Sequence, residues 1–203
     1  MENLLTIETA ANSISNPHST KKPSPDSVIS ALIEIEKQSK KEKKNYQLEQ
    51  LSGNWQLCFI TGTKKTRQKA GIILGAGRYI PTWIKITLSY YSSLNTSKIH
   101  QQIKEGMVEN TVEFSGFKLS LSGVTKFLDR KNILAFDFTK ITIKLFGIQL
   151  YSGYIRGGKE SENKFLTESL AKQAFFVYFL IQERFIAARG RGGGLAIWKK
   201  LEN

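Results

Sequence analysis

A strict alternation of apolar and polar side chains is the feature that most restricts how this chain can fold. It begins after Gly53, where Trp55, Leu57 and Phe59 are separated by single residues and therefore share one face of an extended strand. Similar runs of period two recur along the chain, over residues 84–90, 108–114, 117–121, 133–145, 182–189 and 195–199. A helix would need a spacing of three or four, so we expect these segments to be strands.

Short strands separated by turn residues predict a mainly β fold, an antiparallel sandwich or barrel. The 150 residues from Leu51 to Lys200 accommodate about eight or nine strands, the size at which a closed barrel can enclose one small ligand. Gly190, Gly192 and Gly193 lie between the last two strands, where glycine supplies the positive φ of a tight hairpin turn. We therefore expect one barrel domain over residues 52–201.

The first 51 residues follow a different pattern. Residues 1–25 contain three of the four prolines and show no apolar periodicity, so we expect a flexible lead that can be removed without unfolding the barrel. Residues 26–51 are predicted as a helix region. Asp26 or Ser27 caps a helix that carries an apolar stripe and runs to about Lys44, and its polar second half is expected to protrude or fray.

The charge is strongly positive and unevenly placed. The net charge is +13, and residues 51–104 hold eight basic side chains and no acidic one. Such a field attracts phosphate backbones, acidic proteins or anionic lipids. The basic run Lys64, Lys65, Arg67 and Lys69 predicts a loop that rests on an anionic membrane surface, and a solvated loop is the alternative. A single Arg-Gly segment without a ribonucleoprotein motif makes nucleic acid a minor alternative.

Two segments resemble one known family. Leu51-Ser-Gly-Asn-Trp-Gln-Leu-Cys-Phe-Ile-Thr61 is similar to the opening strand of the plastid lipid-associated proteins, or fibrillins (plastoglobulins), which reads Leu-x-Gly-x-Trp-x-Leu-x-Tyr-x-Thr. Arg189-Gly-Arg-Gly-Gly-Gly-Leu-Ala-Ile197 resembles the closing hairpin of that family. The preceding stretch keeps only the second of the family's two arginines. The resemblance implies an antiparallel lipocalin-like β-barrel preceded by an N-terminal helix.

The same resemblance implies a photosynthetic host and a role at thylakoid membranes or lipid droplets, in a cyanobacterium or a plastid. The implied partner is an apolar small molecule, such as a carotenoid, a quinone or another lipid or isoprenoid. In lipocalin-like barrels a tryptophan of the first strand closes the barrel base and an arginine stacks over it, which assigns a structural role to Trp55 and Arg189. Phe59 and Leu57 on the same strand face, and Trp83 at the barrel rim, are then the expected ligand contacts.

Catalytic and metal-binding patterns are not apparent. His18, His100 and Cys58 do not have the spacing of metal ligands, and no nucleophile elbow, zinc-protease helix or dinucleotide fingerprint occurs. With a single cysteine, no internal disulfide can form, and Cys58 is expected to be a buried apolar side chain. We therefore predict no catalytic residue, no metal and no cofactor.

Three hypotheses remain open. The first is a non-catalytic carrier or structural protein for lipids or isoprenoids at a thylakoid or droplet surface. The second is an interaction protein with a packed barrel and a basic face for a partner. The third is a pigment-handling enzyme on a lipocalin-like barrel. No transmembrane segment is expected, since the longest apolar run, Phe175 to Ile181, is far shorter than the ~20 residues that cross a bilayer.

Overall fold

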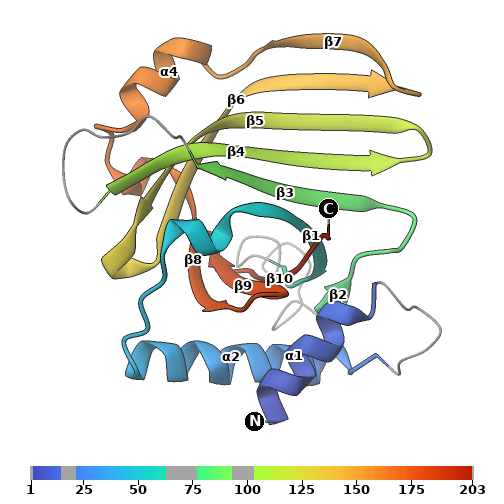
Figure 1. Ribbon diagram of the computed structural model, residues 1–203, viewed down its shortest axis with the longest axis vertical. Helices are drawn as coiled ribbons and strands as arrows, with labels where there is room; N and C mark the ends of the chain where they lie inside the picture. The colour runs from blue at the N-terminus through green and yellow to red at the C-terminus, as the bar shows by residue number, and fades with distance from the viewer. Residues whose placement is uncertain (1, 15–21, 63–76, 93–102, 203) are drawn as a thin grey trace.

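The structure, a computed structural model, describes residues 2–14, 22–62, 77–92 and 103–202 of the 203-residue chain (Figure 1). The strands are β1 (Gly53–Ile60), β2 (Arg78–Tyr79), β3 (Lys85–Ser92), β4 (Ile103–Phe114), β5 (Phe117–Leu128), β6 (Ile133–Leu145), β7 (Ile148–Tyr154), β8 (Ala174–Ile181), β9 (Phe185–Gly190) and β10 (Leu195–Lys200). The helices are α1 (Glu2–Asn12), α2 (Pro25–Lys41) and α4 (Gly158–Phe165), with 3-10 turns η1 (Leu48–Leu51), η2 (Asp129–Lys131) and η3 (Leu170–Lys172).

Eight of the strands form a closed antiparallel barrel. They follow one another in the order β1, β3, β4, β5, β6, β8, β9 and β10, and the pairing of β10 with β1 closes the circle. The two additional strands lie outside this path, with β2 paired to β1 and β7 paired to β6. The mainly β, antiparallel barrel predicted from the alternation is therefore confirmed, together with a helix before it.

The interior of the barrel is packed with side chains at the end where all eight strands are present. Trp55, Phe127, Leu134, Tyr178 and Ile186 are each at most 1% exposed and belong to one core cluster. The hydroxyl groups of Tyr90 and Tyr178 share a 2.7 Å hydrogen bond inside this core. Burial raises the pKa of both phenols, so the pair stays neutral at physiological pH.

The expected flexible lead is wrong for residues 2–12, which form helix α1. Ile7, Ala10 and Ala11 are at most 1% exposed and pack in a second core cluster against α2 and the outer side of the barrel. The spacing of Leu4, Ile7 and Ala11 gives α1 an apolar stripe, contrary to the expectation of no apolar periodicity. Removal of residues 1–24 would uncover this cluster, so the expectation that the barrel tolerates the deletion has lost its physical basis.

Helix α2 begins two or three residues earlier than predicted and does not protrude. Ser24 is its N-cap and accepts a hydrogen bond from the amide of Ser27, with Pro25 in the first turn. The polar second half is held against the barrel, because Glu36 and Ser39 are each only 6% exposed. The expectation of a protruding second half is therefore wrong.

A β-bulge in β1 reverses the direction in which its last side chains point. Leu57 lies opposite Trp198 and Phe59 lies opposite the next residue, Ile197, so Cys58 is the extra residue of the bulge. Leu57 consequently faces the barrel interior, whereas Phe59 is fully buried in the cluster beneath the helices. The prediction that Phe59 faces a ligand inside the barrel is wrong, because one inserted residue moves it to the other side of the sheet.

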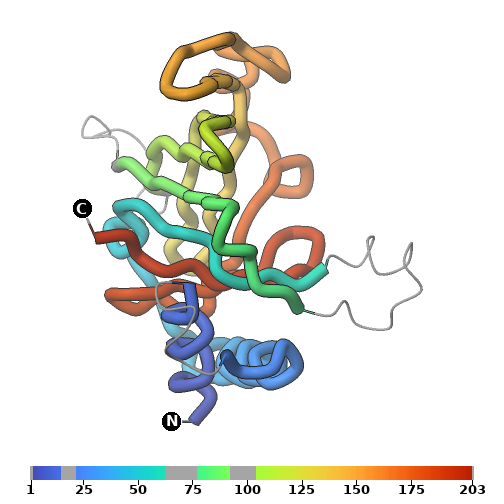
Figure 2. Tube along the Cα trace, turned by 90° about the vertical axis from the view of Figure 1, so that its right-hand side faces the viewer, coloured from blue at the N-terminus to red at the C-terminus, as the bar shows by residue number. Residues whose placement is uncertain are grey.

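The strands differ greatly in length around the barrel. β5 has 12 residues and β9 has 6. The difference of six residues, at about 3.3 Å per residue, corresponds to about 20 Å of strand length. β4, β5 and β6 have 12 or 13 residues, and together with β7 they therefore extend beyond the closed part of the barrel as an overhanging sheet (Figure 1). Figure 2 shows α1 and α2 at one end of the molecule and β7 at the other.

Candidate functional site

The inner face of the overhanging sheet is largely apolar. Val108 belongs to the barrel core, and the cross-strand register places Val112, Leu119 and Ile143 on the same side of the sheet further along the strands. We call this face the apolar trough; its nine residues are Val112, Phe114, Phe117, Leu119, Leu121, Ile141, Ile143, Leu145 and Ile148.

The outer face of the same sheet is polar. Lys118, Ser120, Thr142 and Lys144 alternate with the trough residues, and Ser120 lies directly opposite Thr142 in the register. Helix α4 approaches β5 and β6 from this outer side: Ser161 donates a hydrogen bond to Asp137, and Thr139 donates one to Glu162. The apolar and polar sides of the overhang are therefore distinct.

The trough is only partly shielded from water. None of its nine residues is classed as buried, and none belongs to either core cluster. Phe114, Leu145 and Ile148 are 42%, 38% and 69% exposed. Among the described helices, α1 and α2 contact β1, β8 and β10 at the other end of the molecule, and α4 lies on the outer face. The trough is thus an apolar surface with no described helix packed over it.

Two tight hairpin turns end the overhang. Ser115 and Gly116 connect β4 to β5, Phe146 and Gly147 connect β6 to β7, and all four have positive φ, as a two-residue hairpin turn of type I′ requires. The amide of Phe146 donates a 2.8 Å hydrogen bond to the carbonyl of Gly116, which joins the turns side by side. We call these two turns the tip.

Phe146 is an unusual residue for its position in the tip. It has a φ of 46°, in a region where bulky L side chains are rare, and its side chain is 77% exposed. Its ring covers Gly116, where an added Cβ would lie 2.4 Å from a ring carbon. Glycine or asparagine would satisfy this backbone better, so the aromatic side chain adds exposed apolar surface at a local conformational cost.

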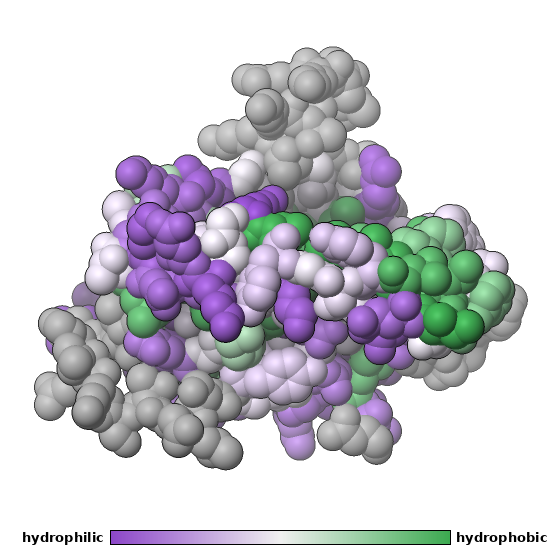
Figure 3. Space-filling view, turned by 90° about the horizontal axis from the view of Figure 1, so that it is seen from above, coloured by the Kyte–Doolittle hydropathy of each residue, from purple (hydrophilic) through white to green (hydrophobic). Residues whose placement is uncertain are grey.

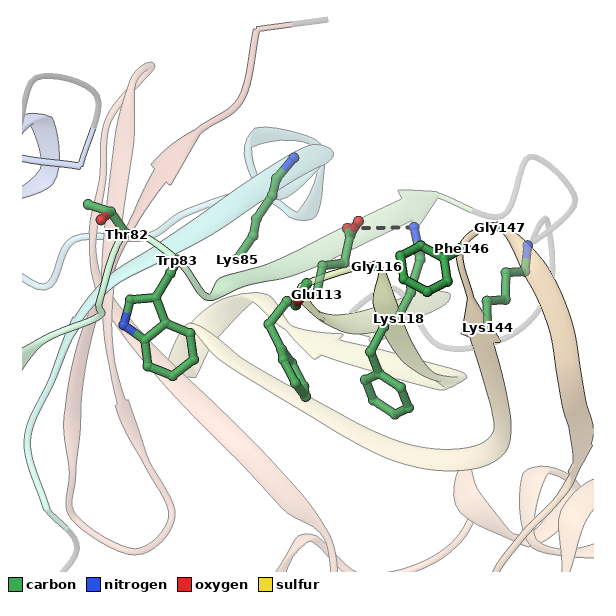
Figure 4. A pocket seen from close by; sticks show the side chains of 12 residues that line it. Thr82, Trp83, Lys85, Glu113, Gly116, Lys118, Lys144, Phe146 and Gly147 are labelled. Carbon is green, nitrogen blue, oxygen red and sulfur yellow. Dashed lines mark ion pairs between the residues drawn. The ribbon is translucent and has the colours of Figure 1, made fainter.

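A pocket of about 400 Å³ lies between the tip and Trp83 (Figure 4). Trp83, an expected ligand contact, is 69% exposed and lies in the turn before β3. Lys85, Lys118 and Lys144 also line this pocket, and Lys118 forms a 3.6 Å ion pair with Glu113. Apolar surface gathers at one end of the face seen in Figure 3. Exposed rings and lysine side chains therefore occur together at this end of the barrel.

The predicted stacking of Arg189 on Trp55 is wrong. The indole N–H of the fully buried Trp55 donates a 2.7 Å hydrogen bond to the carbonyl of Leu51, and the Nζ of Lys200 lies 5.3 Å from the centre of its ring. Arg189 instead forms hydrogen bonds to both carboxylate oxygens of Glu36 and donates one from Nη1 to the carbonyl of Gly193. Arg189 thus ties α2 to the last hairpin. Trp55 is a core residue, and the cation near its ring is Lys200 instead of Arg189.

The remaining predicted residues fall in three places. Leu57 lies in the packed core, 9% exposed, and not in the trough. The closing hairpin has the predicted glycine turn between β9 and β10, with positive φ at Gly193 but not at Gly190 or Gly192. The basic run Lys64, Lys65, Arg67 and Lys69 lies outside the described residues.

Sequence reasoning missed the tip. The segment from Leu145 to Leu150 contains four large apolar residues around Gly147, which is unusual for a hairpin turn and is a signal that the sequence offers. No helix in the described part of the chain is long and apolar enough to cross a membrane. The described ranges also contain no cluster of three or more His, Cys, Asp or Glu side chains arranged to hold a metal ion.

Comparison of the chain with protein-family models gave no match, and comparison with curated proteins gave none either. The resemblance to the fibrillins therefore continues to depend on the two segments Leu51–Thr61 and Arg189–Ile197.

Proposed function

We propose that this protein is a non-catalytic lipid-binding protein that holds an apolar molecule, such as an acyl or isoprenoid chain, in the apolar trough. The observation that carries the proposal is the inner face of the overhang, which carries nine apolar side chains that the described helices leave uncovered. Exposed apolar surface of this extent on a single protein commonly marks a binding site.

The chemistry of the trough favours a neutral, chain-like ligand with at most a small polar group. The nine trough side chains are aliphatic or phenylalanine, so they offer shape and dispersion contacts but no hydrogen bond. Tyr151 lies opposite Ile143 on the same face and adds one phenol hydroxyl at the β7 edge. Asn110 lies on the same face, where the trough meets the packed core opposite Leu88 and Leu121. A carbonyl or hydroxyl at one end of the ligand would find a hydrogen-bond partner in this amide. A quinone or an oxygenated isoprenoid meets this description.

The tip and Trp83 support a location at a lipid surface. Exposed aromatic rings such as those of Phe146 and Trp83 suit the boundary between head groups and acyl chains. Lys85, Lys118 and Lys144 beside them would face anionic head groups, each contributing about 1 kcal/mol near the surface. The thylakoid or lipid-droplet surface suggested by the family resemblance is the specific form of this proposal.

An interaction protein is the second candidate. Among the described strands, β7 pairs with β6 alone, so no described strand occupies its other edge, where another chain could pair. Leu150 and Tyr151 on β7 are 61% and 52% exposed. A protein partner could therefore add a strand at this edge and cover the trough. The closed part of the barrel is filled with side chains, which is compatible with this candidate because it needs no internal cavity.

Binding of the neutral fluorescent dye Nile red tests the lipid-binding proposal. The variant Leu119→Asp with Ile143→Asp places two carboxylates in the trough. The matched control, Ser120→Asp with Thr142→Asp, places the same charges on the neighbouring residues of the same strands, on the outer face. We expect saturable binding to the wild type and the control, and at least a tenfold weaker affinity in the trough variant, because a charge in an apolar site opposes desolvation.

Circular dichroism melts establish that both variants are folded. Equal Nile red affinity in the folded trough variant and its control, or no saturable binding to the wild type, would refute the proposal. If the trough variant alone loses binding, organic extraction of the purified protein, followed by mass spectrometry, would identify the lipid that the trough holds.

A further inference from the structure

We infer that a basic pocket beside the end of α2 binds a small phosphorylated molecule, one that carries a diphosphate or phosphomonoester group. The pocket has a volume of about 560 Å³ and is built by the end of α2 and the segment after it, by η2, and by β8. Figures 1 and 2 place α2 at the opposite end of the molecule from β7, so this site is separate from the apolar trough.

The lining of the basic pocket is strongly cationic. Lys40, Lys43, Lys44, Arg130 and Lys131 line it, and Glu36 is the only carboxylate among its lining residues. Glu36 is already engaged by Arg189 and by Lys40, whose Nζ lies 2.9 Å from Oε1. The surplus of positive charge therefore has no counterpart inside the pocket.

Three of the five cations are available to a ligand. Lys44 pairs with Glu42 at 3.0 Å and Lys40 with Glu36. Within the described ranges, the side chains of Lys43, Arg130 and Lys131 have no carboxylate within 4.0 Å. Like charges gathered without an anion destabilise one another, and a bound phosphate group would remove that repulsion.

Asn132 holds the backbone frame of the basic pocket. Its Oδ1 accepts a 2.9 Å hydrogen bond from the amide of Tyr46, and its Nδ2 donates one to the carbonyl of Lys44. The carbonyl of Asn132 accepts a 2.9 Å hydrogen bond from the amide of Tyr178 on β8. Three segments distant in sequence are thus fixed together, and their cations are presented from a pre-formed frame, which reduces the entropy lost on binding.

Lys43 occupies a position where local conformation favours a different residue. It follows the end of α2 with a φ of 50°, in the left-handed region where glycine or asparagine usually ends a helix. A lysine at this point is conformationally unfavourable but contributes a cation to the pocket. Lys43→Gly therefore removes the charge without opposing the backbone, which makes it a suitable test variant.

Calorimetric titration with inorganic pyrophosphate tests the inference. The pocket variant Lys43→Gly with Lys131→Gln removes two cations. The control Lys140→Gln with Lys172→Gln removes two exposed lysines from other parts of the described surface, neither of which forms an ion pair there. We expect one site in the wild type and in the control, and at least tenfold weaker binding in the pocket variant. Equal affinities in the two variants, or no binding to the wild type at 50 mM salt, would overturn the inference.

Vesicles distinguish a soluble phosphorylated molecule from the phosphate head group of a lipid. In one outcome, the wild type floats with phosphatidic acid vesicles, pyrophosphate reverses the flotation, and the pocket variant fails to float. This result supports the inference and identifies a lipid as the source of the phosphate group. Pyrophosphate binding without this pocket-dependent flotation supports it with a soluble ligand. Nile red binding is measured in parallel, and its absence would refute the lipid-binding proposal while leaving this inference intact, because the two sites share no residue.

Discussion

Substitution of Arg189 by alanine should weaken the attachment of α2 to the barrel. The Glu36 carboxylate is buried, with its side chain only 7% exposed, and Arg189 binds both of its oxygens. The variant leaves this carboxylate with Lys40 alone. Loss of one partner from a fully buried pair costs about 3–5 kcal/mol, and the 32% exposure of the Arg189 side chain reduces that figure, so we expect a loss of about 2–3 kcal/mol in the free energy of unfolding.

The reverse substitution, Glu36→Gln, should cost less. It leaves Arg189 without a countercharge, but that guanidinium reaches water and keeps its 2.7 Å hydrogen bond to the carbonyl of Gly193. The amide of a glutamine also still offers one acceptor. We expect about 1 kcal/mol for this variant. The asymmetry between the two substitutions follows from which partner is left buried.

The dependence on pH gives a second test of the same ion pair. Burial raises the pKa of Glu36, but hydrogen bonds from Arg189 and Lys40 and their positive charges lower it by more, so it lies below its ordinary value of 4.5 in the folded protein. A lowered carboxylate pKa stabilises the fold above the unfolded pKa, and this contribution is lost as pH falls through the folded pKa. The gap between wild type and Arg189→Ala should therefore be largest at pH 7 and narrow below about pH 4.5.

Urea unfolding at pH 7 and at pH 4, followed by circular dichroism, measures these differences. Arg184→Ala is the control, because Arg184 is exposed and its side chain forms no hydrogen bond or ion pair within the described ranges. It should change stability by less than about 0.5 kcal/mol. If Arg189→Ala behaves like this control, or if its deficit is the same at both pH values, the ion pair does not hold α2 to the barrel.

Three further predictions concern other parts of the molecule. Ile7→Ala should reduce the free energy of unfolding by about 2–4 kcal/mol, because the Ile7 side chain is 0% exposed. Leu5→Ala should have little effect, because Leu5 on the same helix is 63% exposed. Equal urea midpoints for the two variants would show that α1 does not stabilise the barrel. Burial raises the pKa of the Cys58 thiol to about 12, so Ellman's reagent at pH 8 should label it only after unfolding, and rapid labelling of the native protein would contradict this. Gly193→Ala, at a φ of 83°, should lower stability by about 1 kcal/mol, whereas Gly190→Ala should be tolerated, and thermal melts of the two variants would distinguish them.

The alternation in the sequence was sufficient to predict the barrel and most of its strands. Residues 133–145 were predicted as one strand and form β6 with those bounds, because Ile141, Ile143 and Leu145 alternate strictly with polar residues. The same pattern placed these side chains on one face. It did not indicate that this face would extend beyond the closed part of the barrel, because that depends on the length of strands paired elsewhere.

The predictions that were wrong have identifiable physical causes. In Leu57-Cys58-Phe59 all three side chains are apolar, so the sequence does not distinguish a regular strand from the bulge that turns Phe59 towards the helices. The pairing of Arg189 with Glu36 joins residues 153 positions apart, and nothing in the local pattern of either segment indicates it. Helix α1 is different, because its apolar spacing was present in the sequence and could have been recognised.

The stability of the fold does not explain why large apolar side chains occupy exposed positions at and beside the tip. Phe146, Ile148 and Leu150 are each more than 60% exposed, and each would contribute about 1.5–3 kcal/mol if it were buried. Polar residues would suit these positions in water better, and asparagine would suit the backbone at Phe146. The side chains therefore contribute little to the fold, and they form exposed apolar surface of the kind that the proposed lipid binding requires. If Phe146→Asn raises the melting temperature and weakens binding to liposomes, the fold and the function make opposing demands on this one residue.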